Sequence, residues 1–426
     1  MSRLVIKGGR VLDPSQGLDF TGDVAIEDGV IREVSAEIDA HGSEVFDASG
    51  LIVAPGFIDM HVHLREPGFE HAETIETGSR SAAAGGFTSI CCMPNTNPVN
   101  DSAMVTSYIV DRARRFACVN VFPIGAITKN SAGEELAAIA SMKQEGIVAV
   151  SDDGKPVMNA RVARRGMEIA GSLDLPFIEH CEDLHLSAGG DMHEGTESTR
   201  LGLRGIPRSS EDVMVARDII LAEVTGVRYH VAHISSGKSV EMVREAKRHG
   251  AKVTSEVTPH HFVLADSDMR PYDSSFKMKP PLREKCDLEG VTRGVLDGTI
   301  DAIATDHAPH AGAEKMQEFE RCPFGIIGLE TAIPLALGHF FHSGKLALSE
   351  VVKLFTQGPA QIVLPDRGTL RVGAPADVTI FDLHRAWTYD VNNSPSKSRN
   401  TPFDGRPFLG GPRATIVAGK IVWRRD

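Results

Sequence analysis

The amino-acid sequence predicts an α/β protein: a (β/α)8 TIM-type barrel with a small β-domain built from both ends of the chain. Between residues 56 and about 310, eight short apolar runs alternate with helix-period segments, which is typical of parallel strands joined by helices. Residues 1–55 and 367–426 instead contain short strands punctuated by glycine. Because the two ends of a barrel lie near each other on its surface, we expect the flanks to pair into one composite domain beside a barrel at 56–366.

The eight runs are rich in Val, Ile, Ala and Phe without strict polar alternation, as expected of strands buried on both faces. Helix-period segments such as 'EELAAIASMKQEG' and 'SVEMVREAKRHG' lie between them. The polar stretch at 392–402 is expected to be a loop or linker, and residues 310–325 a mobile active-site loop. In chain order the runs are 'GFIDMHVH', 'TSICCMPN', 'VNVFPIGAIT', 'GIVAVSDD', 'LPFIEHCED', 'RYHVAHIS', 'KVTSEVTPHH' and 'DAIATDHAPH'.

Composition narrows the class of protein. With 42% hydrophobic and 24% charged residues and a net charge of -12, the chain is ordinary for a globular protein and a poor partner for nucleic acid. It has neither a signal-peptide core at its start nor a run approaching the roughly 18 apolar residues of a membrane span. We therefore expect a cytoplasmic protein without membrane contact. The six cysteines have no CxxC spacing, which predicts reduced thiols in the core.

Histidines and aspartates end several of the predicted strands. In a barrel these ends meet at one mouth, so the side chains are expected to converge there. Each residue alone has an ordinary structural explanation, such as a hydrogen-bonded core histidine or a turn aspartate. Together they would crowd costly polar groups unless a cation neutralises them, which favours a metal site. The six candidates are His61, His63, Asp153, His180, His233 and Asp306.

Six ligands are more than one tetrahedral Zn²⁺ with an open position needs, so the sequence predicts two ions. We assign His61, His63 and Asp306 to one ion. His180 and His233 are assigned to the other, with Asp153 as the bridge. A water between two cations loses a proton readily to give a bridging hydroxide nucleophile. Asp306 could act as the general base and later pass the proton to a leaving group, which is hydrolytic chemistry.

Longer motifs carry a family resemblance. 'PGFIDMHVHLREPG', 'MPNTNP', 'VTPHH', 'TDHAPH' and 'PFGIIGLET', with the tail 'GTLRVGAPADVTIFD', resemble bacterial dihydroorotases of type I, in the amidohydrolase superfamily, along essentially the whole chain. The resemblance implies zinc-dependent, reversible cyclisation of N-carbamoyl-L-aspartate to (S)-dihydroorotate and water, the third step of de novo pyrimidine biosynthesis. Many relatives in the superfamily bridge their metals with a carboxylated lysine. 'GIVAVSDDG' has no lysine, so Asp153 takes that role here, as in type I enzymes.

The resemblance also implies the contacts of the substrate. A guanidinium beyond the metal ligands can hold a carboxylate with two hydrogen bonds, which explains an arginine directly after 'HVHL'. One position departs from the family, because 'FKMKPPLR' stands where relatives often have 'FKMNPPLR', so Lys279 occupies the position of that asparagine. His260 and His261 are expected to be core or supporting groups. The implied substrate contacts are Arg65, Asn95, Lys279, His310, Phe324 and Gly325.

Two alternatives remain open. An allantoinase or dihydropyrimidinase would have the same barrel and metals, but Arg65 argues against it because their substrates present no carboxylate at that place. A non-catalytic scaffold for aspartate carbamoyltransferase would be expected to lose metal ligands, and all six are kept. As partners we expect the small-molecule substrate and a second copy of the chain in a homodimer, with aspartate carbamoyltransferase as a further candidate.

Overall fold

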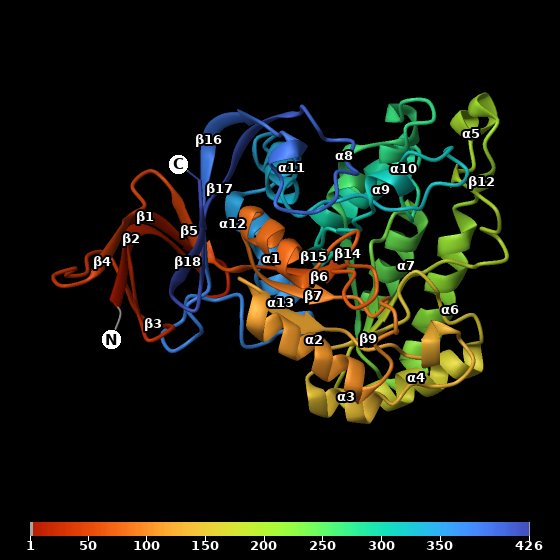
Figure 1. Ribbon diagram of the computed structural model, residues 1–426, viewed down its shortest axis with the longest axis horizontal. Helices are drawn as coiled ribbons and strands as arrows, with labels where there is room; N and C mark the ends of the chain where they lie inside the picture. Colours follow the sequence, from red (N-terminus) through yellow and green to blue (C-terminus); the bar gives the residue numbers. More distant parts are fainter. Residues whose placement is uncertain (1–2, 426) are drawn as a thin grey trace.

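Eight parallel strands form the predicted barrel in the computed structural model, which describes residues 3–425 (Figure 1). They pair in two sheets, β6-β7-β8 and β15-β14-β13-β10-β9. Single parallel bridges join Gly125 to Val150 and Val62 to His307, and these bridges close the ring. The predicted barrel is therefore confirmed. Its strands are β6 (Phe57–Val62), β7 (Phe87–Cys92), β8 (Asn120–Pro123), β9 (Val150–Ser151), β10 (Phe177–Glu179), β13 (Tyr229–Val231), β14 (Val253–Val257) and β15 (Ala302–Ile303).

Amphipathic helices cover the outside of the barrel. In α4 (Ala160–Ser172), the Asn159 side chain caps the first turn, and the buried residues Ala163, Met167 and Ala170 recur at helical spacing on one face. The other outer helices are α1 (Ile75–Ala84), α2 (Ala103–Phe116), α3 (Ile139–Glu145), α6 (Ser209–Thr225), α7 (Gly237–Arg248), α9 (Lys285–Leu296), α12 (Leu348–Phe355) and α13 (Gln357–Val363). Shorter elements are α5 (Thr196–Leu201), α8 (Pro259–Val263), α10 (Gly312–Lys315), α11 (Ala332–Ala336), β11 (Met192–His193) and β12 (Gly205–Ile206).

The predicted helix 'EELAAIASMKQEG' is wrong over its first five residues. Helix α3 begins only at Ile139, and the residues before it pair with the chain that leaves β8. Leu136 forms a bridge with Thr128, and the Ala137 amide donates to the Ile127 carbonyl at 2.9 Å. Tertiary pairing thus overrides the helical propensity of this segment. The helix predicted at 'SVEMVREAKRHG' is confirmed as α7.

Both flanks of the barrel pair into one β-domain, as predicted, and Figure 1 shows the two chain ends on it. The junction is β5 (Ile52–Pro55), which runs antiparallel to β16 (Val378–Thr388) and parallel to β1 (Arg3–Asp13). The separate core of this domain includes Ile6 and Ile380. The boundaries placed at residues 56 and 367 stay a prediction. The remaining strands are β2 (Leu18–Glu27), β3 (Val30–Ser35), β4 (Glu44–Asp47), β17 (Pro407–Val417) and β18 (Lys420–Arg424).

The polar stretch at 392–402 is a loop, but its interpretation as a linker is wrong. Ser394, Ser396, Ser398 and Asn400 are buried, whereas Lys397 lies between two of them at the surface with its ammonium on the Glu70 carbonyl. The Ser398 hydroxyl donates to the Ala72 carbonyl at 2.8 Å. Alternate side chains thus dock on the barrel, and small hydroxyls satisfy buried polar groups there.

Between residues 3 and 425, no helix is long and apolar enough to span a membrane. All six cysteines are free. Four of them are buried, as predicted, and Cys118 is half-buried. Cys286 is exposed on α9, so the prediction of a core thiol is wrong there.

Candidate active site

The C-terminal ends of five barrel strands bring the six predicted ligands to one mouth. His61 lies on β6 and His63 directly after it, while Asp153 follows β9 by two residues. All six residues are buried, with exposed fractions of 6% or less. The strands end where their apolar runs stop, so the polar residues that follow face the shared mouth. His180, His233 and Asp306 follow β10, β13 and β15 in the same way.

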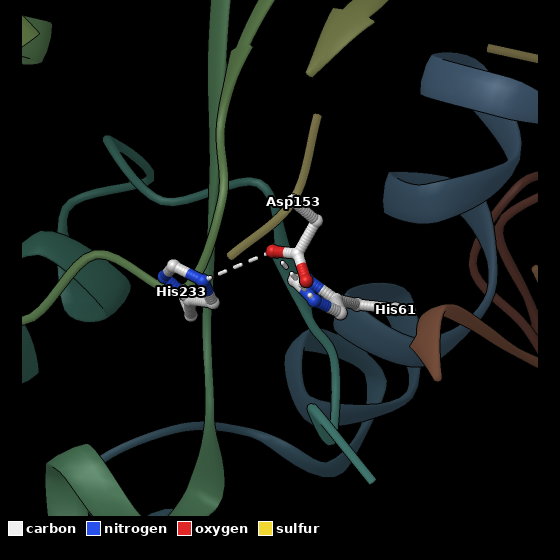
Figure 2. Close-up of side chains that lie close together, drawn as sticks. All are labelled: His61, Asp153 and His233. Carbon is white, nitrogen blue, oxygen red and sulfur yellow. Dashed lines mark ion pairs between the residues drawn. The ribbon is translucent and has the colours of Figure 1, made fainter. Parts of the chain in front are cut away.

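Asp153 lies at the centre of the cluster. Its Oδ1 is 3.4 Å from His61 Nε2, 3.6 Å from His233 Nε2 and 3.8 Å from His180 Nδ1. Figure 2 shows the carboxylate between His61 and His233. The second oxygen, Oδ2, is 3.6 Å from His63 Nε2. One carboxylate therefore faces four imidazoles, as a residue shared between two ions would.

Asp306 closes the cluster on the other side. Its Oδ1 is 2.9 Å from His63 Nε2 and 3.6 Å from His61 Nε2. The candidate ligand atoms form two groups, and within each group all atoms lie within 4.8 Å of one another. One group is His61, His63 and Asp306, and the other is His61, Asp153 and His233. The first is the set that the sequence assigns to one ion. His180 stands outside both groups, with its Nδ1 2.9 Å from His233 Nε2.

The cluster fits a divalent cation. His61 Nε2 and Asp153 Oδ1 are buried without any hydrogen-bond partner, and such atoms are costly unless something neutralises them. Neutral imidazole nitrogens with carboxylate oxygens suit metals such as Zn²⁺. The donor set and the two unsatisfied atoms thus favour the same kind of ligand, a metal ion.

Electrostatics keep the two aspartates ionised. Burial would raise the pKa of Asp153, but the neighbouring imidazoles of His61, His233 and His63 outweigh burial and hold this pKa well below its ordinary value. The pKa of Asp306 is likewise lowered, because the hydrogen bond from His63 and the nearby imidazoles outweigh burial. Both carboxylates can therefore act as ligands at neutral pH.

Three residues of the mouth have backbone conformations that are rare outside glycine. Arg65, His233 and Asp306 have φ angles of 60°, 31° and 48°. Such a conformation costs on the order of 1 kcal/mol or more, so the surrounding structure must hold it in place. With these backbone conformations, the His233 and Asp306 side chains lie in the cluster and the Arg65 side chain lies at its rim.

Outer partners hold the imidazoles, and sequence reasoning missed two of them. His61 Nδ1 is 2.7 Å from Glu256 Oε1, and His180 Nε2 is 2.8 Å from Glu182 Oε2. A glutamate inside the buried run 'KVTSEV' was the available sign of the first, because an unpaired charge there would be costly. His260 and His261 lie outside the two groups of ligand atoms, as predicted, and His261 Nδ1 is 2.7 Å from the Thr258 hydroxyl.

Arg65 and His310 meet at the rim of the mouth. The Arg65 Nε donates to the Pro309 carbonyl at 3.1 Å, and its Nη2 lies 3.4 Å from His310 Nε2. Within residues 3–425 the guanidinium forms no ion pair with a carboxylate. Burial and the Arg65 charge lower the pKa of His310 to about 3, so its imidazole is neutral at pH 7. Among residues 3–425, this half-buried arginine therefore has a neutral imidazole beside it and no anionic partner.

The other expected substrate contacts differ in what they touch. Asn95 Oδ1 lies 2.9 Å from His63 Nδ1, and its amide donates to Asp153 Oδ2 at 3.3 Å, so it supports the ligands. The Lys279 ammonium lies 2.7 Å from Glu182 Oε1. Gly325 has φ 128°, and a Cβ there would come within 2.7 Å of the Ala308 side chain. The contacts of Asn95, Lys279, Phe324 and Gly325 with substrate stay predictions.

The segment 310–325 is anchored along its length. The buried Lys315 of α10 donates to the Pro323 carbonyl at 2.8 Å and to the Gly325 carbonyl at 3.1 Å. His310 Nε2 is 2.8 Å from the Phe324 carbonyl oxygen. These contacts hold the two ends together, while Met316, directly after α10, is 88% exposed. The predicted mobility of this loop stays a prediction.

Asn400 ties this loop to the C-terminal segment. Its Oδ1 accepts from the His310 amide at 3.2 Å, and its Nδ2 donates to the Ala308 and Gly325 carbonyls, each at 3.0 Å. The side chain is 5% exposed, so all of its hydrogen bonds are made within the protein. A residue outside the barrel thus joins the two stretches that carry His310 and Gly325, a contact that no local pattern in the sequence reveals.

Comparison with known proteins agrees with this geometry. A family profile described as dihydro-orotase-like matches residues 50–239, and one described as amidohydrolase family matches residues 302–423. A dihydroorotase from Solibacter usitatus is 66% identical over 423 residues, covering 99% of this chain and 98% of that protein. One from Pelotomaculum thermopropionicum is 54% identical over 420 residues, with the same coverage.

Among solved structures, the L-hydantoinase (dihydropyrimidinase) of Arthrobacter aurescens superposes with a TM-score of 0.90 and 25% identity. It covers 100% of this chain and 96% of its own. The fold is thus shared with hydantoinases, while sequence identity is far higher to the dihydroorotases. The barrel, the six converging candidate ligands and the identity along the full chain lead to one conclusion: the chain belongs to the dihydroorotase family.

Proposed function

We propose that the protein catalyses the reversible ring opening of (S)-dihydroorotate to N-carbamoyl-L-aspartate. The observation that carries the proposal is one mouth holding six metal-type ligands and an arginine without a carboxylate partner. Dihydroorotate offers what both need, an amide carbonyl to hydrolyse and a carboxylate to bind. The high identity to proteins named dihydroorotase supports the same reaction.

We further propose two Zn²⁺ ions as the metals. His61, His63 and Asp306 would hold one, His180 and His233 the other, with Asp153 shared between them. Bound there, the ions would lower the pKa of water and polarise the amide carbonyl. The unsatisfied His61 Nε2 and Asp153 Oδ1 support this assignment.

Asp306 is proposed as the acid and base of the reaction. Its carboxylate is ionised, so it can accept a proton from the attacking water. As the ring C–N bond breaks, the same group returns that proton to the departing nitrogen, which leaves the ring-opened ureido acid. Arg65 would hold the carboxylate at the rim with its fork of donors, and the neutral His310 would close the pocket beside it.

The direct test is ring opening by the purified protein, with metals counted beforehand by elemental analysis. We expect between one and two divalent ions per chain, turnover of dihydroorotate, and loss of turnover when a chelator removes the ions. Re-addition of Zn²⁺ should restore it. Turnover by a protein that holds no metal and cannot be loaded would refute the assigned chemistry. Preferred turnover of a hydantoin or allantoin would favour the alternative that the shared fold allows.

Asn400→Ala should weaken substrate binding without loss of metal. Removing its hydrogen bonds frees the His310 and Gly325 stretches, so KM for dihydroorotate should rise about tenfold, on the scale of one buried hydrogen bond. Asn392→Ala, a change at an exposed position of the same segment, serves as the control. Steady-state kinetics with metal analysis decide between the outcomes. An unchanged KM would mean that this anchor does not shape the pocket.

A homodimer, an association with aspartate carbamoyltransferase and a cytoplasmic location complete the proposal and stay predictions. A non-catalytic scaffold is the weaker alternative, since the chain keeps all six ligands at the mouth. Measurable ring opening by the isolated protein would exclude it.

A further inference from the structure

A second carboxylate layer surrounds the metal ligands, and its members are held in different ways. Metal-binding histidines usually donate their other ring N–H to a carboxylate or carbonyl, which fixes the ring and its tautomer. Here Glu256 partners His61, and Glu182 partners His180. Glu256 is part of strand β14 and is 0% exposed, so the sheet itself holds it in place. Glu182 lies instead in the loop after β10, where no ladder fixes it.

Lys279 supplies the support that this loop lacks. Its ammonium lies 2.7 Å from Glu182 Oε1, while Glu182 Oε2 lies 2.8 Å from His180 Nε2. Each carboxylate oxygen of Glu182 therefore has one partner. Lys279 contacts Glu182, and Glu182 contacts the candidate ligand His180. Between residues 3 and 425, no other lysine or arginine forms an ion pair with Glu182.

Burial makes this ion pair matter. The Glu182 side chain is 7% exposed and that of His180 is 4% exposed, whereas that of Lys279 is 27% exposed. Removing the partner of a buried carboxylate leaves an uncompensated charge, which is strongly unfavourable, so the Glu182 side chain would turn away from His180 toward water. That movement would remove the contact that orients the His180 ring.

Phe324 further restricts the position of the Lys279 ammonium. The ammonium lies 4.9 Å from the centre of the Phe324 ring, within the range of a cation–π contact. The Lys279 ammonium thus contacts the Glu182 carboxylate and the Phe324 ring, both groups of the protein itself. This differs from the substrate contact that the family resemblance implies for the position.

We propose that Lys279 is a positioning residue of the metal site: through its ion pair it holds the Glu182 carboxylate that orients His180, with the ring Nδ1 directed at Asp153 and His233. This inference rests on the proposed metal-dependent function. It assigns Lys279 to metal retention, not to substrate recognition.

The test measures metal affinity directly, by competition of the Zn²⁺-loaded protein against a chromophoric chelator. Lys279→Met and Glu182→Gln should each lower the affinity for the Zn²⁺ ion that His180 would hold by about 10- to 100-fold, as loss of such outer partners does elsewhere. Lys279→Arg, which can keep the ion pair, should restore most of the affinity. The double variant should bind metal no more weakly than Glu182→Gln alone, because Lys279 acts through Glu182.

Controls separate this role from others. Lys155→Met removes an exposed lysine two residues after Asp153 and should leave metal affinity unchanged. With metal in excess, Lys279→Met should keep the wild-type KM for dihydroorotate. A raised KM with unchanged metal affinity would instead make Lys279 a substrate contact and overturn the inference.

The outcomes also distinguish this inference from the proposed function. A wild-type protein that binds no divalent metal would overturn the function itself. A wild-type protein that binds metal and opens dihydroorotate, with Lys279→Met equal to it in metal affinity, would overturn only the role of Lys279. If Lys279→Met does not fold, Glu182→Gln decides, since wild-type metal affinity in that variant contradicts the inference.

Discussion

Asp306→Asn is expected to lower kcat for dihydroorotate by a factor of roughly 10² to 10⁴, the usual contribution of a positioned acid or base. Asparagine keeps an oxygen at the same place, but it cannot accept a proton from water. The loss should therefore fall on kcat far more than on KM, because proton transfer occurs only in the transition state. Steady-state kinetics of the metal-loaded variant measure this.

Metal content must accompany that measurement, since Asp306 is also a proposed ligand. Asp301→Asn provides a matched control. It lies at the opposite end of the same strand, where it pairs with Lys247 at 2.7 Å, and should cost stability without lowering kcat greatly. A near-normal kcat in Asp306→Asn with full metal would remove this residue from the proton-transfer step.

Arg65→Met is expected to lower kcat/KM for dihydroorotate about 30-fold or more, equivalent to about 2 kcal/mol for a lost charge-assisted contact. A guanidinium has no lone pair to offer a metal, so metal content should not change. Methionine keeps a Cβ and similar length, and the cost of the positive φ angle stays the same. The effect should therefore report on the substrate.

The choice of substrate makes this prediction specific. Dihydrouracil, a cyclic amide without the carboxylate, should show a much smaller loss in Arg65→Met, if the wild-type protein turns it over. Arg65→Lys should recover only part of the rate, because an ammonium lacks the two-pronged geometry of the fork. Equal losses on both substrates would mean that Arg65 supports the fold or the metals instead.

The barrel could be predicted because its strands are buried on both faces. Continuous apolar runs ending in polar residues are a local property, and all eight runs became strands. Prediction was less successful where pairing between distant segments decides the secondary structure. Leu136 belongs to a helix-period segment, but its bridge to Thr128 keeps it out of α3.

The candidate site shows the same division. His61, His63 and Asp306 could be grouped in advance, since strand ends of a parallel barrel share one mouth. Asn400 could not, because the hydrogen bonds that join it to Ala308 and Gly325 span 92 and 75 residues. From sequence alone, a polar stretch such as 392–402 is interpreted as a linker, because the surface on which its side chains are buried is not known.

Local sequence is enough to predict which side chains reach the mouth of the barrel, because strand periodicity and the end of each apolar run are encoded locally. The contacts of those side chains depend on how distant segments pack. Lys279 and Glu182 are 97 residues apart, and each could be a solvated surface charge. They pair because two loops from different strands meet beside His180, where a buried carboxylate needs a cation.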